Sequence, residues 1–255
     1  MKSNDSSRRD FIKNTSLAGA LGLAIPAIVS SAFSAEKAGK KIKIEKDDVI
    51  LFQGDSITDS GRKKDDPNYN TASIFGNGYA MIAASEILAK NADKNLKIYN
   101  RGISGNKVFQ LAERWEKDCL ALKPTIVSIH IGVNDFWHTL TSKYTGTIKT
   151  YRDDLTALLN RTKQSLPGVK LIIGEPFGVT GIKAVDEKWY PTFNEYRAAA
   201  RDIANDFDAV FIPYQRVFDN AQQAAPGVYW TSDGVHPTLA GAGLMANACL
   251  QTVKF

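Results

Sequence analysis

Three residues have the types and spacing for nucleophilic catalysis: Ser56, Asp233 and His236. Ser56 lies in GDSIT at 54–58, directly after an apolar run, and the other two lie in SDGVHP at 232–237. A serine hydroxyl is a weak nucleophile at neutral pH and needs a base, which an imidazole can supply. A carboxylate on the other ring nitrogen would orient that base. Because Asp233 precedes His236 by three residues, one tight turn through Gly234 can hold both.

Acyl transfer also needs hydrogen-bond donors for the oxyanion that develops on the substrate. Three candidates follow apolar runs: the N–H of Ser56, the N–H of Gly102 in NRGISGN, and the side-chain amide of Asn134 in IGVND. Gly102 lacks a Cβ, so its amide could approach a ligand closely. Together these groups predict an oxyanion hole.

Each of these residues also has a purely structural interpretation. Ser56 could be a turn or helix-capping residue, and Asn134 could end a strand. Asp233 could bind backbone amides of the last helix instead of His236. For Asp55, beside Ser56, we expect a local hydrogen-bonding role or a place in the substrate cleft, and no direct part in catalysis.

Several other histidines and aromatic residues flank these motifs. His130 lies within an apolar run and is expected in the core. Trp137 and His138, just beyond GVND, and Trp230, just before the Asp/His loop, are candidates for the substrate cleft. For the tryptophans, stacking on a sugar ring and packing within the core remain open.

The elements that must position these residues alternate along the chain. Short apolar runs predict five strands, and longer amphipathic runs predict five helices. The strands are expected at 49–53, 97–101, 125–132, 170–174 and 209–213, and the helices at 78–90, 108–122, 147–166, 187–207 and 238–253.

This alternation predicts an α/β domain with a parallel sheet between helical layers. In such sheets ligands bind outside the carboxyl ends of the strands. Ser56, Gly102 and Asn134 each follow a predicted strand, and the Asp233/His236 loop lies downstream of the fifth. We therefore expect the candidate residues to meet at one edge of the sheet.

In order, these blocks resemble the four marker blocks of the SGNH/GDSL hydrolases: GDSIT, Gly102, GVND and DGVH. The resemblance spans about residues 48–253. It implies a three-layer α/β/α, flavodoxin-like fold with a five-stranded parallel sheet of order 2-1-3-4-5. It also implies a Ser56-His236-Asp233 triad, the oxyanion hole of Ser56, Gly102 and Asn134, and no metal or organic cofactor. Thr58 replaces the second glycine of the G-x-S-x-G elbow, which argues against the ordinary α/β-hydrolase fold.

Within that family, NRGISGN, RWEKDCLALKP and VSIHIGVNDFW resemble a secreted bacterial branch that deacetylates plant polysaccharides. The resemblance therefore implies a serine esterase for short acyl groups, above all acetyl, on carbohydrate. One alternative is a lysophospholipase or acyl-thioesterase with the same machinery. An alternative of another class is a non-catalytic carbohydrate-binding protein on a hydrolase scaffold.

Residues 1–34 have the pattern of an export signal. The paired arginines in SRRDFIK precede 22 uncharged residues that end among small side chains. This pattern is typical of a twin-arginine signal, which is recognised by the export machinery and cleaved near residues 30–34. We expect a linker at 35–47, a hydrolase domain at 48–255, and a periplasmic or secreted protein without stable membrane insertion. An uncleaved membrane anchor is the alternative.

The composition of the chain argues against several classes of binding partner. The formal charge is +5, and no Lys/Arg cluster indicates nucleic-acid binding. No Cys/His grouping has the spacing of a metal site. Cys119 and Cys249 could pair in an oxidising compartment or be small buried apolar residues. The expected partner is a small-molecule or polysaccharide ester, and the sequence leaves the oligomeric state open.

Overall fold

The structure is a computed structural model that describes residues 24–34 and 40–255. Its strands are β1 Ile42–Lys43, β2 Val49–Gly54, β3 Lys97–Asn100, β4 Ile126–His130, β5 Lys170–Gly174, β6 Val210–Ile212 and β7 Val253–Lys254. Its α-helices are α2 Ala24–Phe33, α3 Ser56–Asp59, α4 Tyr79–Lys90, α5 Val108–Asp118, α6 Val133–Thr141, α7 Ile148–Ser165, α8 Phe193–Asp206, α9 Tyr214–Ala221, α10 Gly227–Trp230 and α11 Leu239–Leu250. Three 3₁₀ turns, η1 Ala72–Ile74, η2 Leu120–Leu122 and η3 Glu187–Trp189, complete the set.

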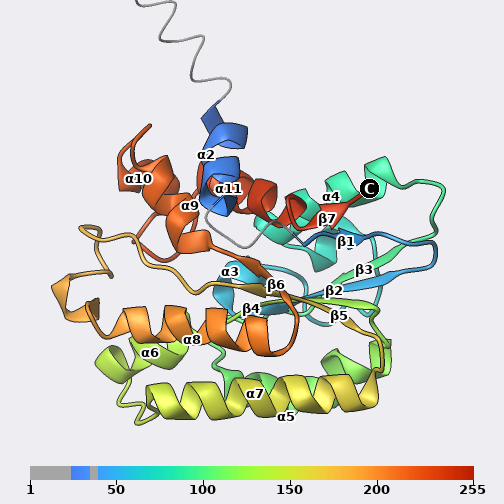
Figure 1. The fold of residues 1–255 in the computed structure, drawn as a ribbon, viewed down its shortest axis with the longest axis horizontal. Coiled ribbons are helices and arrows are strands. Elements are labelled where there is room, and N and C mark those ends of the chain that lie inside the picture. Colours follow the sequence, from blue (N-terminus) through green and yellow to red (C-terminus); the bar gives the residue numbers. More distant parts are fainter. Residues whose placement is uncertain (1–23, 35–39) are drawn as a thin grey trace, which may run out of the picture.

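The main sheet has five parallel strands in the order β3-β2-β4-β5-β6. In chain order this is 2-1-3-4-5, which confirms the predicted topology. All residues of β4 are buried, as expected of a central strand covered on both faces. Helices α5, α7 and α8 cover one face, and α4, α9 and α11 cover the other (Figure 1).

The predicted helices form, with shifted ends. The segment expected to be one helix over 187–207 divides into η3 and α8, with Pro191 between them. A proline lacks the N–H that a continuous helix would use, which accounts for the break. The predicted last helix ends at Leu250, because the chain then extends into β7, which pairs with β1 in a second, two-stranded sheet. No sequence pattern predicted this small sheet.

The amino-terminal residues of the described chain pack on the domain. In α2, Val29 and Ala32 are fully buried, and the Asn220 side chain of α9 donates to Ser31 Oγ at 2.9 Å. Figure 1 shows α2 beside α9 and α11. Residues 1–23, the first part of the predicted signal, lie outside the described residues, as do residues 35–39 of the predicted linker. Ile42 and Ile44, in the remaining linker, are buried.

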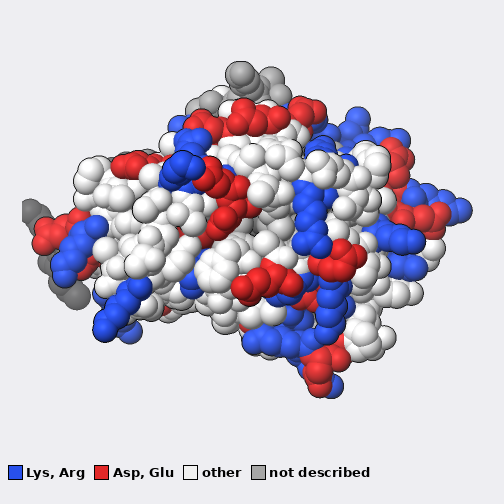
Figure 2. Space-filling model, turned by 90° about the horizontal axis from the view of Figure 1, so that it is seen from below, with Lys and Arg blue, Asp and Glu red and all other residues white. Residues whose placement is uncertain are grey.

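The helical layer of α5, α7 and α8 presents a mixed charged surface. Figure 2 shows basic and acidic side chains interspersed on this face. Ion pairs between helices include Arg152 with Asp202 at 2.6 Å and Arg161 with Glu116 at 2.9 Å. These pairs are exposed, so each contributes about 1 kcal/mol or less to stability.

Both cysteines are free thiols buried in the domain, as the interpretation of small apolar residues expects. Burial raises the pKa of Cys119 and of Cys249 to about 12, so both stay protonated and unreactive at neutral pH. Within residues 24–34 and 40–255, no helix combines the length and the apolar character required to cross a bilayer.

Candidate active site

Ser56 is the first residue of a short helix that begins where the inner strand β2 ends. Asp55 caps this helix, since its Oδ1 accepts the Ile57 N–H at 3.0 Å. The cap holds α3 at the carboxyl edge of the sheet and leaves Ser56 partly exposed there. Asp55 thus has the local hydrogen-bonding role expected of it, and Asp55, rather than Ser56, is the capping residue of α3.

Asp233 and His236 lie in a tight loop between α10 and α11. Asp233 Oδ1 accepts the backbone N–H groups of Val235 at 2.9 Å and of His236 at 2.7 Å. Gly234 adopts a φ of +98°, and a Cβ there would lie 2.7 Å from the carbonyl oxygen of Val179. The Val179 N–H donates to the Gly234 carbonyl at 2.8 Å. The segment after β5 thus fixes this loop, and only glycine fits its centre.

The three predicted catalytic side chains meet in one hydrogen-bonded row. Ser56 Oγ lies 2.8 Å from His236 Nε2, and His236 Nδ1 lies 2.7 Å from Asp233 Oδ2. Ser56 and His236 are 180 residues apart in the chain. With Nδ1 protonated toward the carboxylate, Nε2 is free to accept the hydroxyl proton of Ser56.

The charges in this row favour a strong base. Burial raises the pKa of Asp233, but hydrogen bonds from the His236 side chain and from the His236 and Val235 backbone outweigh it and lower that pKa to about 2. The Asp233 carboxylate is therefore ionised at neutral pH. Its hydrogen bond in turn raises the pKa of His236, against the opposing effect of burial.

Two further carboxyl groups are buried, Asp55 beside the row and Asp135 within electrostatic range of Asp55. Asp55 is fully buried, and Asp135 is 2% exposed. Each uses Oδ1 to cap a helix, Asp135 by accepting the Val108 N–H at the start of α5. In the part of the chain that the structure describes, the Oδ2 of each has no hydrogen-bond partner. Burial raises the pKa of both carboxyls to about 7. Asp55 is thus a capping residue beneath the site and does not line the cleft surface.

The predicted oxyanion donors are not all free. Asn134, near the start of α6, is buried, and its side-chain amide donates to the Asn106 carbonyl at 3.2 Å. The N–H of Gly102, however, donates to Asn100 Oδ1 at 2.9 Å, so it is already bonded within the fold. A Cβ at Gly102 would lie 2.5 Å from the Asp59 backbone nitrogen of α3. Gly102 therefore allows the close packing of α3, and its N–H points away from the assigned role.

The second glycine of NRGISGN has the opposite environment. Gly105 has a φ of +80°, and a Cβ there would meet nothing within 4 Å. Among the described residues, its N–H has no hydrogen-bond partner. It lies in the turn whose Asn106 carbonyl accepts the Asn134 amide. The sequence signal for Gly105 was present in the same motif as Gly102, but only the hydrogen bonds distinguish the two.

Trp137, another of the predicted cleft residues, lies near the row. Its ring centroid is 6.2 Å from that of His236, and the residue is partly exposed. His138 is partly buried, with Nδ1 3.1 Å from Lys107 Nζ. Burial and the neighbouring Lys107 ammonium lower the pKa of His138, so it is neutral and accepts from the lysine.

Trp230 does not line the cleft. It is 4% exposed, and its indole N–H donates to the Ala221 and Ala225 carbonyls at 3.0 and 3.1 Å. Packing is therefore the correct interpretation for this residue. The core prediction for His130 is confirmed: it is 1% exposed, stacks on Phe177, and burial lowers its pKa to about 4.

The residues that form a cavity beside the row were not predicted from the sequence. Ser60, Asn77, Thr238 and Leu239 are among the residues lining it with Ser56 and His236. Its volume is about 330 Å³. Asn77 precedes Gly78 in a loop after α3, a position that the sequence marks only as a turn.

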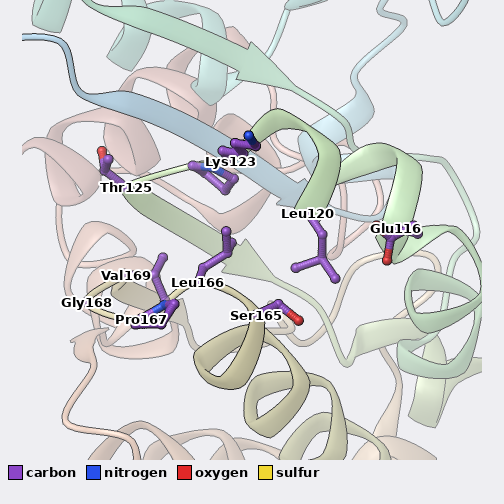
Figure 3. Close-up of a pocket in the computed structure, with 10 residues that line it drawn as sticks. Glu116, Leu120, Lys123, Thr125, Ser165, Leu166, Pro167, Gly168 and Val169 are labelled. Carbon is purple, nitrogen blue, oxygen red and sulfur yellow. The ribbon is translucent and has the colours of Figure 1, made fainter.

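A larger cavity, of about 480 Å³, lies at the opposite, amino end of the strands. Figure 3 shows its lining, which comes from η2 and from the segments before β4 and β5 and includes Lys123, Thr125 and Ser165. In the described part of the chain, no group of three His, Cys, Asp or Glu side chains is arranged to hold a metal ion.

Comparison with known proteins gives the class of this chain. The model of the GDSL-like lipase/acylhydrolase family matches residues 52–244. An acetylxylan esterase of Geobacillus stearothermophilus is 31% identical over 218 residues, which cover 84% of this chain and 97% of that protein. The chain belongs to the GDSL-like lipase/acylhydrolase family and is a carboxylic ester hydrolase.

Two solved structures extend this result. A protein from Parabacteroides merdae described as a GDSL-like lipase superposes with a TM-score of 0.82 at 52% identity, covering 83% of this chain and 98% of that one. The crystal structure of the Geobacillus acetylxylan esterase gives a TM-score of 0.75 at 30% identity, covering 84% and 97%. For that esterase, one serine-to-alanine and one aspartate-to-alanine variant are described as catalytic mutants.

Proposed function

We propose that Ser56, His236 and Asp233 form the catalytic triad of an esterase that removes acetyl groups from a carbohydrate. The observation that carries the proposal is the continuous row from Ser56 Oγ through His236 to Asp233, with contacts of 2.8 and 2.7 Å. The acetylxylan esterase relative, matched over nearly its whole length, supports the choice of substrate.

The reaction follows from the positions of these atoms. Ser56 Oγ attacks the ester carbonyl carbon while His236 Nε2 takes the hydroxyl proton. The C–O bond to the sugar then breaks, and His236 returns the proton to the leaving oxygen. Water, deprotonated by the same histidine, attacks the acetyl-enzyme and releases acetate, and the proton passes back to Ser56. Asp233 stabilises the imidazolium during both halves.

The negative charge on the carbonyl oxygen requires donors close to Ser56. Its own N–H and the Asn134 amide are retained in this role. The N–H of Gly102 is bonded to Asn100, whereas the N–H of Gly105 has no partner among the described residues, and this contrast supports Gly105 as the third donor. Loss of one donor of this kind costs roughly 100- to 1,000-fold in rate.

The test is acetate release from acetylated xylooligosaccharides by the wild type and Ser56→Ala, together with hydrolysis of 4-nitrophenyl esters of increasing acyl length. We expect Ser56→Ala to lose about 10⁴-fold or more in rate on every ester. Wild-type rates should fall sharply beyond acetyl. A rise toward long chains would favour a lysophospholipase or acyl-thioesterase, and glycan binding without any hydrolysis would favour the non-catalytic alternative.

We further propose that the chain is exported by the twin-arginine route and acts in the periplasm or outside the cell. The paired arginines and the uncharged stretch that follows support this placement. Mass spectrometry of the protein recovered from a bacterial expression host would locate the amino terminus. A new terminus near residues 31–35 is expected, and an intact leader in the membrane fraction would contradict the proposal.

A further inference from the structure

The cavity beside Ser56 lies on one particular side of the catalytic row. Its lining includes His236 and the three residues that follow it, through Leu239. Asn134, Gly105 and Trp137 do not contribute to the lining. The cavity therefore opens on the histidine side of Ser56, away from the other two proposed oxyanion donors, Gly105 and Asn134.

This position selects one part of an ester. His236 must be within hydrogen-bond reach of the oxygen that it protonates, which is the oxygen of the leaving alcohol. The carbonyl oxygen must instead point toward the donors of the oxyanion hole. The group carried by the leaving oxygen thus extends toward the His236 side, where the cavity lies.

The lining offers hydrogen-bonding groups that the fold does not use. Ser60 is held in the left-handed region with a φ of +43°, and its carbonyl accepts the Asn77 N–H at 2.9 Å. That bond fixes the two residues side by side. Among the described residues, neither the Ser60 hydroxyl nor the Asn77 side-chain amide has a hydrogen-bond partner. Gly78 leaves room for Ser60, because a Cβ at Gly78 would lie 2.7 Å from Ser60 Cβ.

The cavity also has an apolar rim. Leu239, the first residue of α11, is 81% exposed. A few polar groups set against apolar surface in about 330 Å³ form a small-molecule site at the lower end of the usual size range. A sugar ring matches this lining, since it combines hydroxyl groups with an apolar C–H face.

We propose that this cavity binds the sugar that carries the acetyl group, with Ser60 and Asn77 bonding its hydroxyls and Leu239 packing on its apolar face. The proposal rests on the proposed esterase function and adds to it the residues that select the alcohol. Acetyl esters whose alcohol lacks hydroxyls cannot use these two bonds.

The experiment compares kcat/KM for an acetylated xylooligosaccharide with kcat/KM for 4-nitrophenyl acetate. In Ser60→Ala and Asn77→Ala we expect the ratio of the two values to fall by about 2- to 12-fold, the range of one neutral hydrogen bond. The loss should appear mainly as a higher KM for the oligosaccharide. Ser165→Ala, in the cavity at the other end of the sheet, and Asn160→Ala, on the surface of α7, are the matched controls and should leave the ratio unchanged.

Leu239→Ser tests the same cavity without changing Ser60 or Asn77, whose backbones are bonded to each other. Because Leu239 is exposed, its replacement should leave the thermal unfolding midpoint unchanged and raise KM for the oligosaccharide. The proposal is overturned if the ratio stays at the wild-type value in all three variants. Failure of the proposed function would look different, because Ser56→Ala would then retain activity on both esters.

Discussion

The two ends of the parallel sheet carry cavities of different size and chemistry. The cavity at the amino ends of the strands is larger, about 480 Å³ against about 330 Å³ beside Ser56. Thr125 lines this larger cavity. Its hydroxyl donates to Asp48 Oδ1 at 2.6 Å and accepts the Val49 N–H at 3.0 Å, so Thr125 links the amino ends of neighbouring strands. At the carboxyl ends, the hydroxyl of Ser56 instead contacts a base that is itself oriented by a carboxylate.

Cavity volume alone therefore does not indicate the end of the sheet at which we propose that the reaction takes place. What identifies it is a row of side chains in which each group changes the proton affinity of the next. Parallel strands bring loop residues together at their carboxyl ends, where helix amino termini also point. Changes at the two ends should therefore have very different effects.

The largest expected effect is that of His236→Ala. Removal of the base leaves Ser56 as an ordinary alcohol, and the rate should fall by about 10⁴-fold or more. The measurement is the initial rate of 4-nitrophenyl acetate hydrolysis with purified protein. His138→Ala is the matched control, since that imidazole contacts Lys107 and lies outside the row. Equal losses in the two variants would contradict the assignment of His236 as the base.

Asp233→Asn should have the next largest effect, about 10³- to 10⁴-fold, because an amide cannot hold the same tautomer of His236. The asparagine Oδ1 can still accept the two backbone N–H groups, so the loop should remain folded. The residual activity reports on the pKa of His236. Asp233 raises that pKa, and the histidine must be neutral to act as a base.

The Asp233–His236 pair also determines how activity and stability depend on pH. In the wild type, activity should rise with pH through a midpoint above about 6.5, the ordinary histidine value. In Asp233→Asn that midpoint should move to lower pH. The same two pKa shifts also change how folding stability depends on pH. The lowered pKa of Asp233 stabilises the folded state above about pH 3.8, and this contribution is lost as the pH falls through about 2. The raised pKa of His236 favours folding below about 6.5, and that contribution is lost as the pH rises through the folded value. An unchanged activity midpoint in Asp233→Asn would contradict the account.

A smaller effect should separate the two glycines of NRGISGN. Gly102→Ala places a Cβ about 2.5 Å from the backbone of α3, so it should lower the thermal unfolding midpoint. Gly105→Ala meets no neighbour, but its positive φ strains the turn that presents the N–H. We expect Gly105→Ala to lose mainly kcat and Gly102→Ala to lose mainly stability. Calorimetry with steady-state kinetics tests this, and the reverse assignment would restore Gly102 as the donor.

The smallest effect should come from the amino end of the sheet. Lys123→Ala removes a charged side chain from the larger cavity, yet kcat/KM on 4-nitrophenyl acetate should stay within about twofold of wild type, as for surface changes in general. A loss comparable with that of Asp233→Asn would show that this cavity takes part in the reaction.

The sheet could be predicted from the sequence because its buried strands are short apolar runs and the helices that cover it have apolar residues at helical spacing. Strand order followed from the family resemblance, and the topology confirms it. The two-stranded sheet of β1 and β7 could not be predicted, since each strand has two residues and they are paired across almost the whole chain.

In the proposed site, residue types were sufficient to predict that Ser56, His236 and Asp233 lie together in one hydrogen-bonded row, because few side chains suit nucleophilic catalysis. They were insufficient for Gly102 and Gly105, where the difference is the partner of a backbone N–H. Residue type was also insufficient for Trp230. A tryptophan next to the Asp233/His236 loop gives the same sequence pattern whether its indole lines a cleft or donates to carbonyls in the core. Ser60 and Asn77 carry no sequence signal, as their role depends on one backbone hydrogen bond between them.

The most direct test of the central claim is the site of covalent labelling by a fluorophosphonate. Wild-type protein should form a single adduct on Ser56, identified by peptide mass spectrometry, with parallel loss of esterase activity. Labelling should be absent in Ser56→Ala and strongly slowed in His236→Ala. An adduct on another residue, or full activity in a protein labelled at Ser56, would contradict the account.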